Sequence, residues 1–249
     1  MNAPPTPRRR AAAVLVAGVA VLLSACGDGA TRDDVAPVPS RPTVAPTVPA
    51  TPVVTVPVTT PVFAATVTTV TASDLGASWR AGCPVGPDQL RRLTLSYRDF
   101  DGRAQTGALV VHTEVTDAVT AIFRRLFDAR VPIRRMETVD RYAGSDDASM
   151  AADNTSAFNC RRAVTSGPPQ WSAHAYGRAI DVNPVENPYV LGDKALPPAG
   201  AAFVDRTDVR PGMASPGSAL VEAFAASGWQ WGGRWAGSPD YQHFSADGT

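Results

Sequence analysis

The sequence predicts an α+β fold, in which a small antiparallel sheet is covered by packed helices. Residues 93–97 alternate apolar and polar side chains, and residues 106–115 follow as a second strand after the turn signal Asp101-Gly102. From Thr116 onward the apolar residues instead recur at helical spacing. A β-hairpin followed by an amphipathic helix that covers it is typical of this fold class.

Two helices are expected in the globular part. The first covers residues 116–130, with Thr116 as its N-cap. The second lies within residues 215–229, with Pro216 near its start and Gly228 as its C-terminal stop. The side chains predicted to face the sheet are Val119, Ile122, Phe123, Leu126 and Phe127 in the first helix, and Leu220, Val221 and Phe224 in the second.

The N-terminal part of the chain has the layout of an export signal. Three arginines, Arg8 to Arg10, precede a short apolar run and a group of small residues, which predicts a signal peptide over residues 1–25. "LSAC", ending at Cys26, resembles the bacterial lipobox, in which the cysteine is lipidated. This predicts a protein outside the cytoplasm, lipid-anchored to the bacterial cell membrane. Plain secretory cleavage near Ala25 is the alternative.

Residues 26–72 form the predicted tether. From Val35 to Val70 the sequence is almost entirely Pro, Thr, Val and Ala, a composition that cannot bury a core. In extended polyproline II geometry these residues would span on the order of 100 Å. A stalk that holds a domain away from the membrane is one reading, and a tail without a spacing role is the other. The globular domain is then expected over residues 73–249.

The charge of the chain bears on its partners, and its cysteine content bears on disulfide bonding. The precursor carries 23 basic and 23 acidic residues, and removal of the three signal arginines leaves 20 − 23 = −3. A nucleic-acid partner is therefore not expected. The protein is separately expected to be a monomer. Once Cys26 is assigned to lipid, Cys83 and Cys160 remain as an even pair in an exported protein. A disulfide between them is predicted, with two free buried thiols as the alternative.

The residues that could carry chemistry lie in the C-terminal half. His174 precedes a glycine, and Asp181 lies in an apolar run that predicts a strand. A catalytic zinc site needs three protein ligands, so a third is required. His112 lies on the predicted hairpin and is interpreted as structural, whereas His243 follows Asp240 by three residues. A carboxylate beside a metal ligand can act as a general base, but spacing alone does not prove that these side chains converge.

These motifs resemble those of a known family. "SAHAYGRAID" (residues 172–181) and "DYQH" (residues 240–243) are similar to the VanY-like D-alanyl-D-alanine carboxypeptidases, zinc peptidases that also include phage L-alanyl-D-glutamate endolysins. The resemblance extends over roughly residues 75–247 and includes "NTSAFNCR" and "WGGRW". Many relatives carry Glu where this chain has Asp240, whose side chain is one methylene shorter.

The resemblance implies specific roles. Zn²⁺ would be bound by His174, Asp181 and His243 at one edge of the sheet, with Asp240 as general base. Arg161 would face the substrate near the scissile carbonyl; a surface ion pair is its other reading. Ser172 either contacts substrate or shapes the turn. The long segment 141–170 shows little periodicity, and its "SDDAS" stretch is interpreted as a solvated loop or a rim of the substrate site.

The implied function is zinc-dependent hydrolysis of an amide bond in peptidoglycan stem peptides. D-Ala-D-Ala carboxypeptidase action is the preferred reading. The alternatives are endopeptidase action of the L-Ala-D-Glu type, and a catalytically silent module that only grips the cell wall. The expected partners are peptidoglycan stem peptides and, through the lipid anchor, the membrane.

Overall fold

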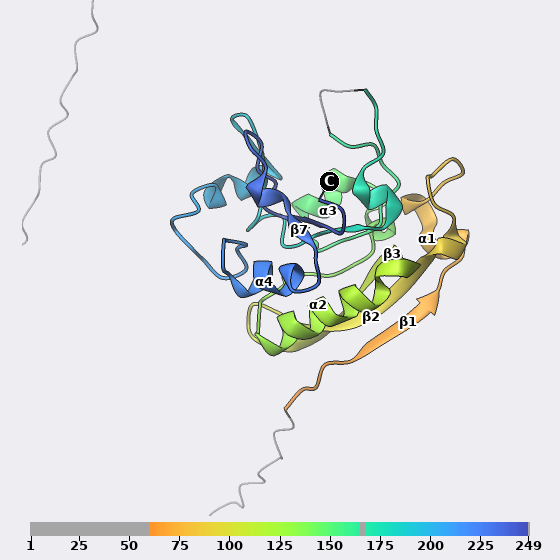
Figure 1. Ribbon diagram of the computed structural model, residues 1–249, viewed down its shortest axis with the longest axis horizontal. Helices are drawn as coiled ribbons and strands as arrows, with labels where there is room; N and C mark the ends of the chain where they lie inside the picture. The colour runs from red at the N-terminus through yellow and green to blue at the C-terminus, as the bar shows by residue number, and fades with distance from the viewer. Residues whose placement is uncertain (1–59, 165–167, 249) are drawn as a thin grey trace, which may run out of the picture. The chain divides into compact units, whose positions relative to one another are not determined.

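The computed structural model describes residues 60–164 and 168–248 (Figure 1). Its three small antiparallel sheets and several helices confirm the predicted α+β class. The predicted signal peptide, Cys26 and most of the predicted tether lie outside the described residues. Within residues 60–164 and 168–248, no helix is both long and apolar enough to cross a membrane.

The first sheet contains the predicted hairpin. Strands β2 (Leu90–Arg98) and β3 (Ala104–His112) pair antiparallel, with Leu93 opposite Leu109. The connecting turn is closed by Asp99, whose Oδ1 accepts hydrogen bonds from the backbone amides of Asp101 and Arg103. Gly102 has a φ of +77°, a conformation that glycine adopts without the steric cost of a Cβ. The turn prediction at Asp101-Gly102 is therefore confirmed.

The packed part of the chain begins earlier than the predicted boundary at residue 73. Strand β1 (Ala65–Thr69) pairs antiparallel with β2 and completes the sheet order β1-β2-β3. Phe63 packs into the main hydrophobic core and contacts the Phe127 ring edge-on at 5.9 Å. The composition of this segment continues that of the predicted tether, but pairing with β2 satisfies its backbone and Phe63 anchors it. Short helix α1 (Ala72–Leu75) follows, capped by Thr71.

Helix α2 (Thr116–Asp128) covers one face of this sheet (Figure 1). The five apolar side chains that its spacing predicted as inward are all buried. The helix begins at Thr116, so Val115 occupies the N-cap position predicted for Thr116. The Thr116 hydroxyl instead donates to the Thr113 carbonyl, because a 3₁₀ turn at Thr113–Val115 runs directly into the helix.

The second sheet has the order β4-β8-β7 and carries the C-terminal motifs. Its strands are short: β4 (Ala179–Asp181), β7 (Gln230–Trp231) and β8 (His243–Ser245). Helix α4 (Ala219–Ala225), capped by Ser218, packs against it through Phe224, which stacks on Phe244 at 4.0 Å. Gly228 follows this helix with a φ of +79°, in agreement with the predicted stop. Phe244 thus joins the helix layer to the strand that carries His243.

Two further elements surround this sheet. Strands β5 (Tyr189–Leu191) and β6 (Lys194–Leu196) form a hairpin. Helix α3 (Asp146–Ala151), capped by Ser145, lies in the segment 141–170, whose sequence shows little periodicity. "SDDAS" is therefore the start of a helix rather than a loop. A helix of six residues is too short for an apolar repeat to be visible in the sequence.

The predicted disulfide is present. Cys83 and Cys160 are bonded, with their Cα atoms 5.8 Å apart. The bond ties the segment before β2 to the residue that precedes Arg161. Cys160 is also fixed through its backbone amide, which donates to the Ser78 carbonyl. Arg161 therefore follows a firmly anchored position.

Candidate metal centre

Three buried side chains converge at the edge of the second sheet. Asp181 on β4 and His243 on β8 are partners in the antiparallel register, so their side chains leave the same face. His174 comes from a 3₁₀ turn (Ala173–Tyr176) directly before β4. Gly177 ends this turn with a φ of +66°, and a Cβ there would lie 2.7 Å from the His112 amide nitrogen. Glycine at position 177 thus lets the turn pack tightly against β3.

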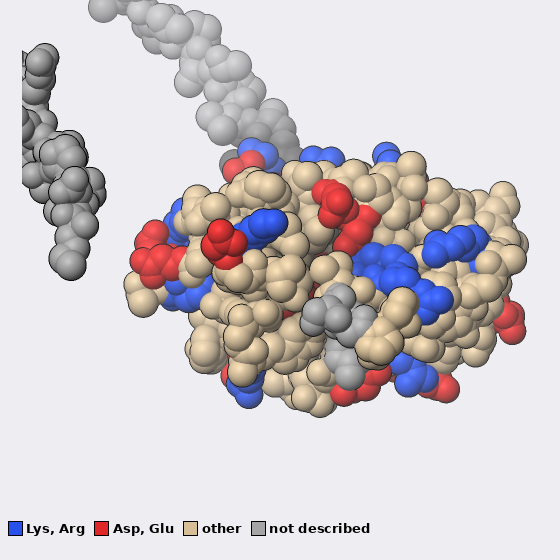
Figure 2. All heavy atoms as spheres, turned by 90° about the horizontal axis from the view of Figure 1, so that it is seen from above, with Lys and Arg blue, Asp and Glu red and all other residues tan. Residues whose placement is uncertain are grey.

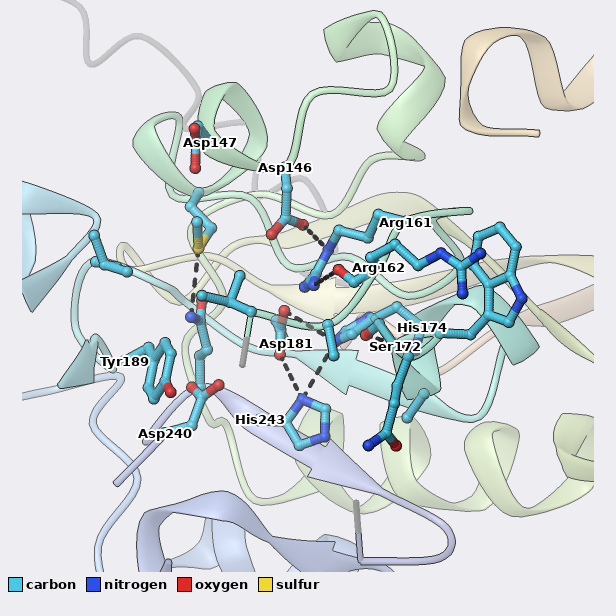
Figure 3. Close-up of a pocket in the computed structure, with 18 of the residues that line it drawn as sticks. Asp146, Asp147, Arg161, Arg162, Ser172, His174, Asp181, Tyr189, Asp240 and His243 are labelled. Atoms are coloured by element: carbon cyan, nitrogen blue, oxygen red, sulfur yellow. Dashed lines mark hydrogen bonds and ion pairs between the residues drawn. The ribbon is translucent and has the colours of Figure 1, made fainter. Parts of the chain in front are cut away.

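The spacing of these atoms suits a metal ion. His174 Nε2 lies 3.2 Å from His243 Nδ1 and 3.1 Å from Asp181 Oδ2, and His243 Nδ1 lies 3.2 Å from Asp181 Oδ1 (Figure 3). Tetrahedral zinc, with ligand bonds of 2.0–2.2 Å, separates its ligand atoms by about 3.3 Å. Two imidazoles and a carboxylate are also a donor set that zinc accepts. The residues present therefore fit the ion that the sequence predicted.

His174 is fixed in the orientation that a ligand requires. Its Nδ1 lies 2.7 Å from the Ala157 carbonyl oxygen, which can only accept a hydrogen bond. Nδ1 is therefore the protonated nitrogen, and Nε2 presents its lone pair toward Asp181 and His243. Ser172 begins the turn, because its hydroxyl accepts from the His174 amide. This bond supports the turn-shaping role of Ser172, which also lines the cavity described below.

The charge of Asp181 is stabilised by its neighbours. Burial alone would raise the pKa of the Asp181 carboxyl, but the adjacent His174 and His243 hold that pKa well below its ordinary value. The carboxylate is therefore ionised across the physiological range. An ionised oxygen ligand between two imidazoles is the protonation state that a cation needs.

Asp240 lies beside the three ligands on the turn that leads into β8. Its backbone amide donates to Gly232 O, and its carbonyl accepts from the His243 amide. Burial and the negative charge of Asp181 raise the pKa of Asp240 to about 7. Its Oδ1 is buried and has no hydrogen-bond partner among the described residues. A carboxylate oxygen with a free lone pair at this position is available to accept a proton.

Gly232 of "WGGRW" makes this arrangement possible. A Cβ at residue 232 would lie 2.8 Å from Asp240 O and 3.2 Å from His243 Cβ. No other residue type fits without moving the turn that holds both side chains. The motif is visible in the sequence, but this role of Gly232 depends on a contact that only the folded chain makes.

Arg161 lines the same cavity and is held by a partner that the sequence did not identify. Its Nε forms an ion pair with Asp146 Oδ1 at 2.9 Å, and Asp146 is the first residue of α3 (Figure 3). "SDDAS" thus borders the site, as one of its two interpretations held. Arg161 lines the cavity, as a substrate contact would, and it also forms an ion pair. The structure therefore agrees in part with each of its two interpretations.

The cavity above these residues has a volume of about 650 Å³. Figure 2 shows basic and acidic side chains gathered near a hollow on one face of the molecule. The cavity is lined by the three candidate ligands and Asp240, by charged residues and by four aromatic side chains: Trp171, Tyr176, Tyr189 and Trp235. Its size and mixed polarity suit a peptide-sized ligand.

His112 takes no part in this site. It is buried at the end of β3, where its Nδ1 accepts a hydrogen bond from the amide of Glu114 in the following 3₁₀ turn. Burial and Arg178 lower the pKa of this imidazole. The structural interpretation of His112 therefore agrees with its surroundings.

Comparison with known proteins supports the reading of this site. Residues 166–246 match the family model described as D-alanyl-D-alanine carboxypeptidase. The chain matches no curated protein and no solved structure. The matched segment contains His174, Asp181, Asp240 and His243. The resemblance to the VanY-like D-alanyl-D-alanine carboxypeptidases is thereby confirmed over the part of the chain that builds the candidate metal centre.

Proposed function

We propose that this protein is a zinc peptidase that hydrolyses an amide bond in peptidoglycan stem peptides, with D-Ala-D-Ala carboxypeptidase action preferred. The observation that carries the proposal is the buried triangle of His174, Asp181 and His243, with Asp240 beside it in one cavity. The family match supports a peptidase. The choice of zinc and of substrate is our inference from the donor set and from the resemblance.

In the proposed mechanism His174, Asp181 and His243 would hold the ion. When bound, zinc supplies Lewis-acid chemistry that polarises a carbonyl and makes water more acidic. Asp240 accepts the proton of the attacking water at Oδ1 and returns it to the nitrogen of the leaving amine. The Arg161 guanidinium, steadied by Asp146, stabilises negative charge that develops on the scissile carbonyl oxygen.

Two alternatives remain beside this proposal. Endopeptidase action of the L-Ala-D-Glu type would use the same ligands and the same base. In a catalytically silent wall-binding module, neither the candidate metal ligands nor Asp240 would take part in a reaction. Asp240 Oδ1 is buried and has no hydrogen-bond partner within residues 60–164 and 168–248, which favours an enzyme, because leaving a buried acceptor unsatisfied is costly unless it serves a function.

The predicted location follows from the N-terminal sequence. A lipid on Cys26 and a Pro-rich stalk would let the domain reach the cell wall while it stays tethered to the membrane. Replacing Cys26 with Ala should release the protein from membranes. Unchanged membrane partitioning of this variant would exclude the anchor.

Hydrolysis is tested with the full-length protein, loaded with zinc and incubated with muropeptides that contain pentapeptide stems. Products are identified by mass, with Asp240→Ala as the control. Loss of one alanine in the wild type alone supports a carboxypeptidase, and a larger fragment supports an endopeptidase. If the muropeptide is retained but not cleaved, the binding module is the better description.

A further inference from the structure

We propose that Arg162, stacked on Trp171, is a carboxylate-binding site in the cavity, separate from Arg161. This inference deepens the proposed function and rests on it for the identity of the substrate. The ligand chemistry is a carboxylate of a stem peptide. It belongs either to the C-terminal residue or to a residue on the acyl side of the scissile bond.

The side chain of Arg162 is held in place by an aromatic platform. Its guanidinium carbon lies 3.8 Å from the centroid of the Trp171 ring, well within cation–π range. The two residues are also partners in an antiparallel bridge, and the next backbone pair, Ala163 N to Gln170 O, is hydrogen-bonded at 2.9 Å. The platform therefore restrains the exposed guanidinium before any ligand binds, which reduces the entropy lost on binding.

The neighbouring arginines already have partners, whereas Arg162 has no carboxylate partner in the part of the chain that the structure describes. Arg161 is paired with Asp146, and Arg80, which lies 5.9 Å from the same indole centroid, donates to the Cys160 carbonyl. Among the described residues, Arg162 takes part in no ion pair within 4.0 Å, although it lines the cavity. A guanidinium that is oriented but not neutralised in a concave site attracts an anion, and its planar fork suits a carboxylate.

The position of Arg162 indicates which carboxylate it would bind. In Figure 3, Arg162 lies on the opposite side of the His174, Asp181 and His243 cluster from Asp240 and Tyr189. In the proposed mechanism Asp240 returns a proton to the leaving amine, so the leaving residue lies on the Asp240 side. Arg162 then faces the acyl part of the substrate. We expect the recognised carboxylate to be upstream of the scissile bond.

Binding experiments with the full-length Asp240→Ala protein test this site, because that variant is expected to bind substrate without cleaving it. Three synthetic pentapeptide stems are compared by calorimetry: one with both carboxylates free, one amidated upstream, and one amidated at the C-terminus. When Arg162→Gln is combined with Asp240→Ala, binding of the peptide with both carboxylates free should weaken about tenfold. Binding of the peptide amidated upstream should be unchanged by it. Arg162→Lys, which keeps the charge but not the fork, should lie between.

Arg80→Gln is the matched control, since Arg80 also lies near Trp171 but does not line the cavity. It should change none of the three affinities. If Arg162→Gln instead leaves unchanged only the affinity of the peptide amidated at its C-terminus, Arg162 is still a carboxylate site, and its ligand is the C-terminal carboxylate. Equal weakening of all three peptides, or no weakening, would overturn the inference.

The proposed function is judged separately, by hydrolysis with wild-type protein. Absence of hydrolysis together with carboxylate-dependent binding would reject the enzyme and support the Arg162 site. Absence of both hydrolysis and binding would reject both. Thermal unfolding of each variant confirms that the comparison is made between folded proteins.

Discussion

Asp181 and His243 face each other across the antiparallel pair of β4 and β8, and Asp181 Oδ1 lies 3.2 Å from His243 Nδ1. Sheet register therefore fixes two of the three candidate ligands, although 62 residues separate them in the sequence. The third, His174, is delivered by a turn whose ends are held by Ser172 and Gly177. The site thus rests on backbone pairing rather than on flexible side chains.

Gly232→Ala should disrupt catalysis without unfolding the protein. The added Cβ would contact Asp240 O at 2.8 Å, so the turn that carries Asp240 must shift. We expect the rate of peptide hydrolysis to fall at least about tenfold, because small displacements of a catalytic group are costly. Gly237→Asn is the control: residue 237 has a φ of +80°, which Asn tolerates, and open space around it. Wild-type rates in Gly232→Ala would contradict this account of the turn.

Removing the Cys83–Cys160 disulfide should affect activity more than metal content. The bond precedes Arg161 directly, whereas Asp181 and His243 lie beyond it on the second sheet and His174 lies on the turn before β4. It closes a loop with a sequence separation of 77, for which chain entropy predicts a loss of stability of about 4 kcal/mol. The double variant Cys83→Ser, Cys160→Ser is compared with wild type for hydrolysis and for zinc per chain. A parallel loss of both would show that the disulfide supports the whole site instead.

Asp146→Asn should impair the enzyme through Arg161. The change removes the charge that pairs with Arg161 Nε at 2.9 Å and leaves the shape of the side chain. We expect the catalytic rate to fall several-fold, because the pair orders a charged group near the reaction, while zinc content stays constant. Asp147→Asn is the matched control, since this exposed residue borders the same cavity. If both substitutions have the same effect, general charge at the rim is responsible rather than the pair.

Stability should fall as the pH rises toward 7 because of Glu186. Burial and the neighbouring Asp153 raise the pKa of Glu186 from 4.5 to about 7, although Arg134 opposes them. The folded state therefore binds the proton more tightly than the unfolded state does. This contribution is complete below about pH 4.5 and is lost as the pH rises through 7. The neutral amide of Glu186→Gln avoids this loss.

The free energy of unfolding, measured with urea at pH 5 and pH 8, checks this prediction. Between these two values, the Glu186→Gln protein should gain on the order of 1 kcal/mol relative to wild type. A difference that does not change with pH would show that Glu186 is ionised in the folded protein throughout this range.

The sequence predicted the elements whose signal is local. Helix α2 carries a complete apolar repeat, and the turn at Asp101-Gly102 needs only two residues, so both agree with the structure. Strand β1 was assigned to the tether because its composition continues the Pro/Thr/Val-rich segment. Only its pairing with β2 marks it as part of the domain.

The residues of the candidate site also fall into two groups: those that short sequence motifs identify and those that only the folded structure reveals. His174, Asp181 and His243 could be named from short motifs, and the structure brings them together. The roles of Asp146, Gly232 and Arg162 depend on how turns and loops fold back to bring side chains into contact, which no helix or strand pattern in the sequence reveals. No local pattern distinguishes an aspartate that pairs with Arg161 from one in a solvated loop.

The metal content of the purified full-length protein tests the central claim most directly. Zinc is measured by elemental analysis in wild type, His243→Ala and Asp240→Ala, with circular dichroism to confirm that each is folded. We predict about one zinc ion per chain in wild type and in Asp240→Ala, and a loss of most zinc in His243→Ala. Equal zinc content in folded wild type and His243→Ala would contradict the assignment of this site.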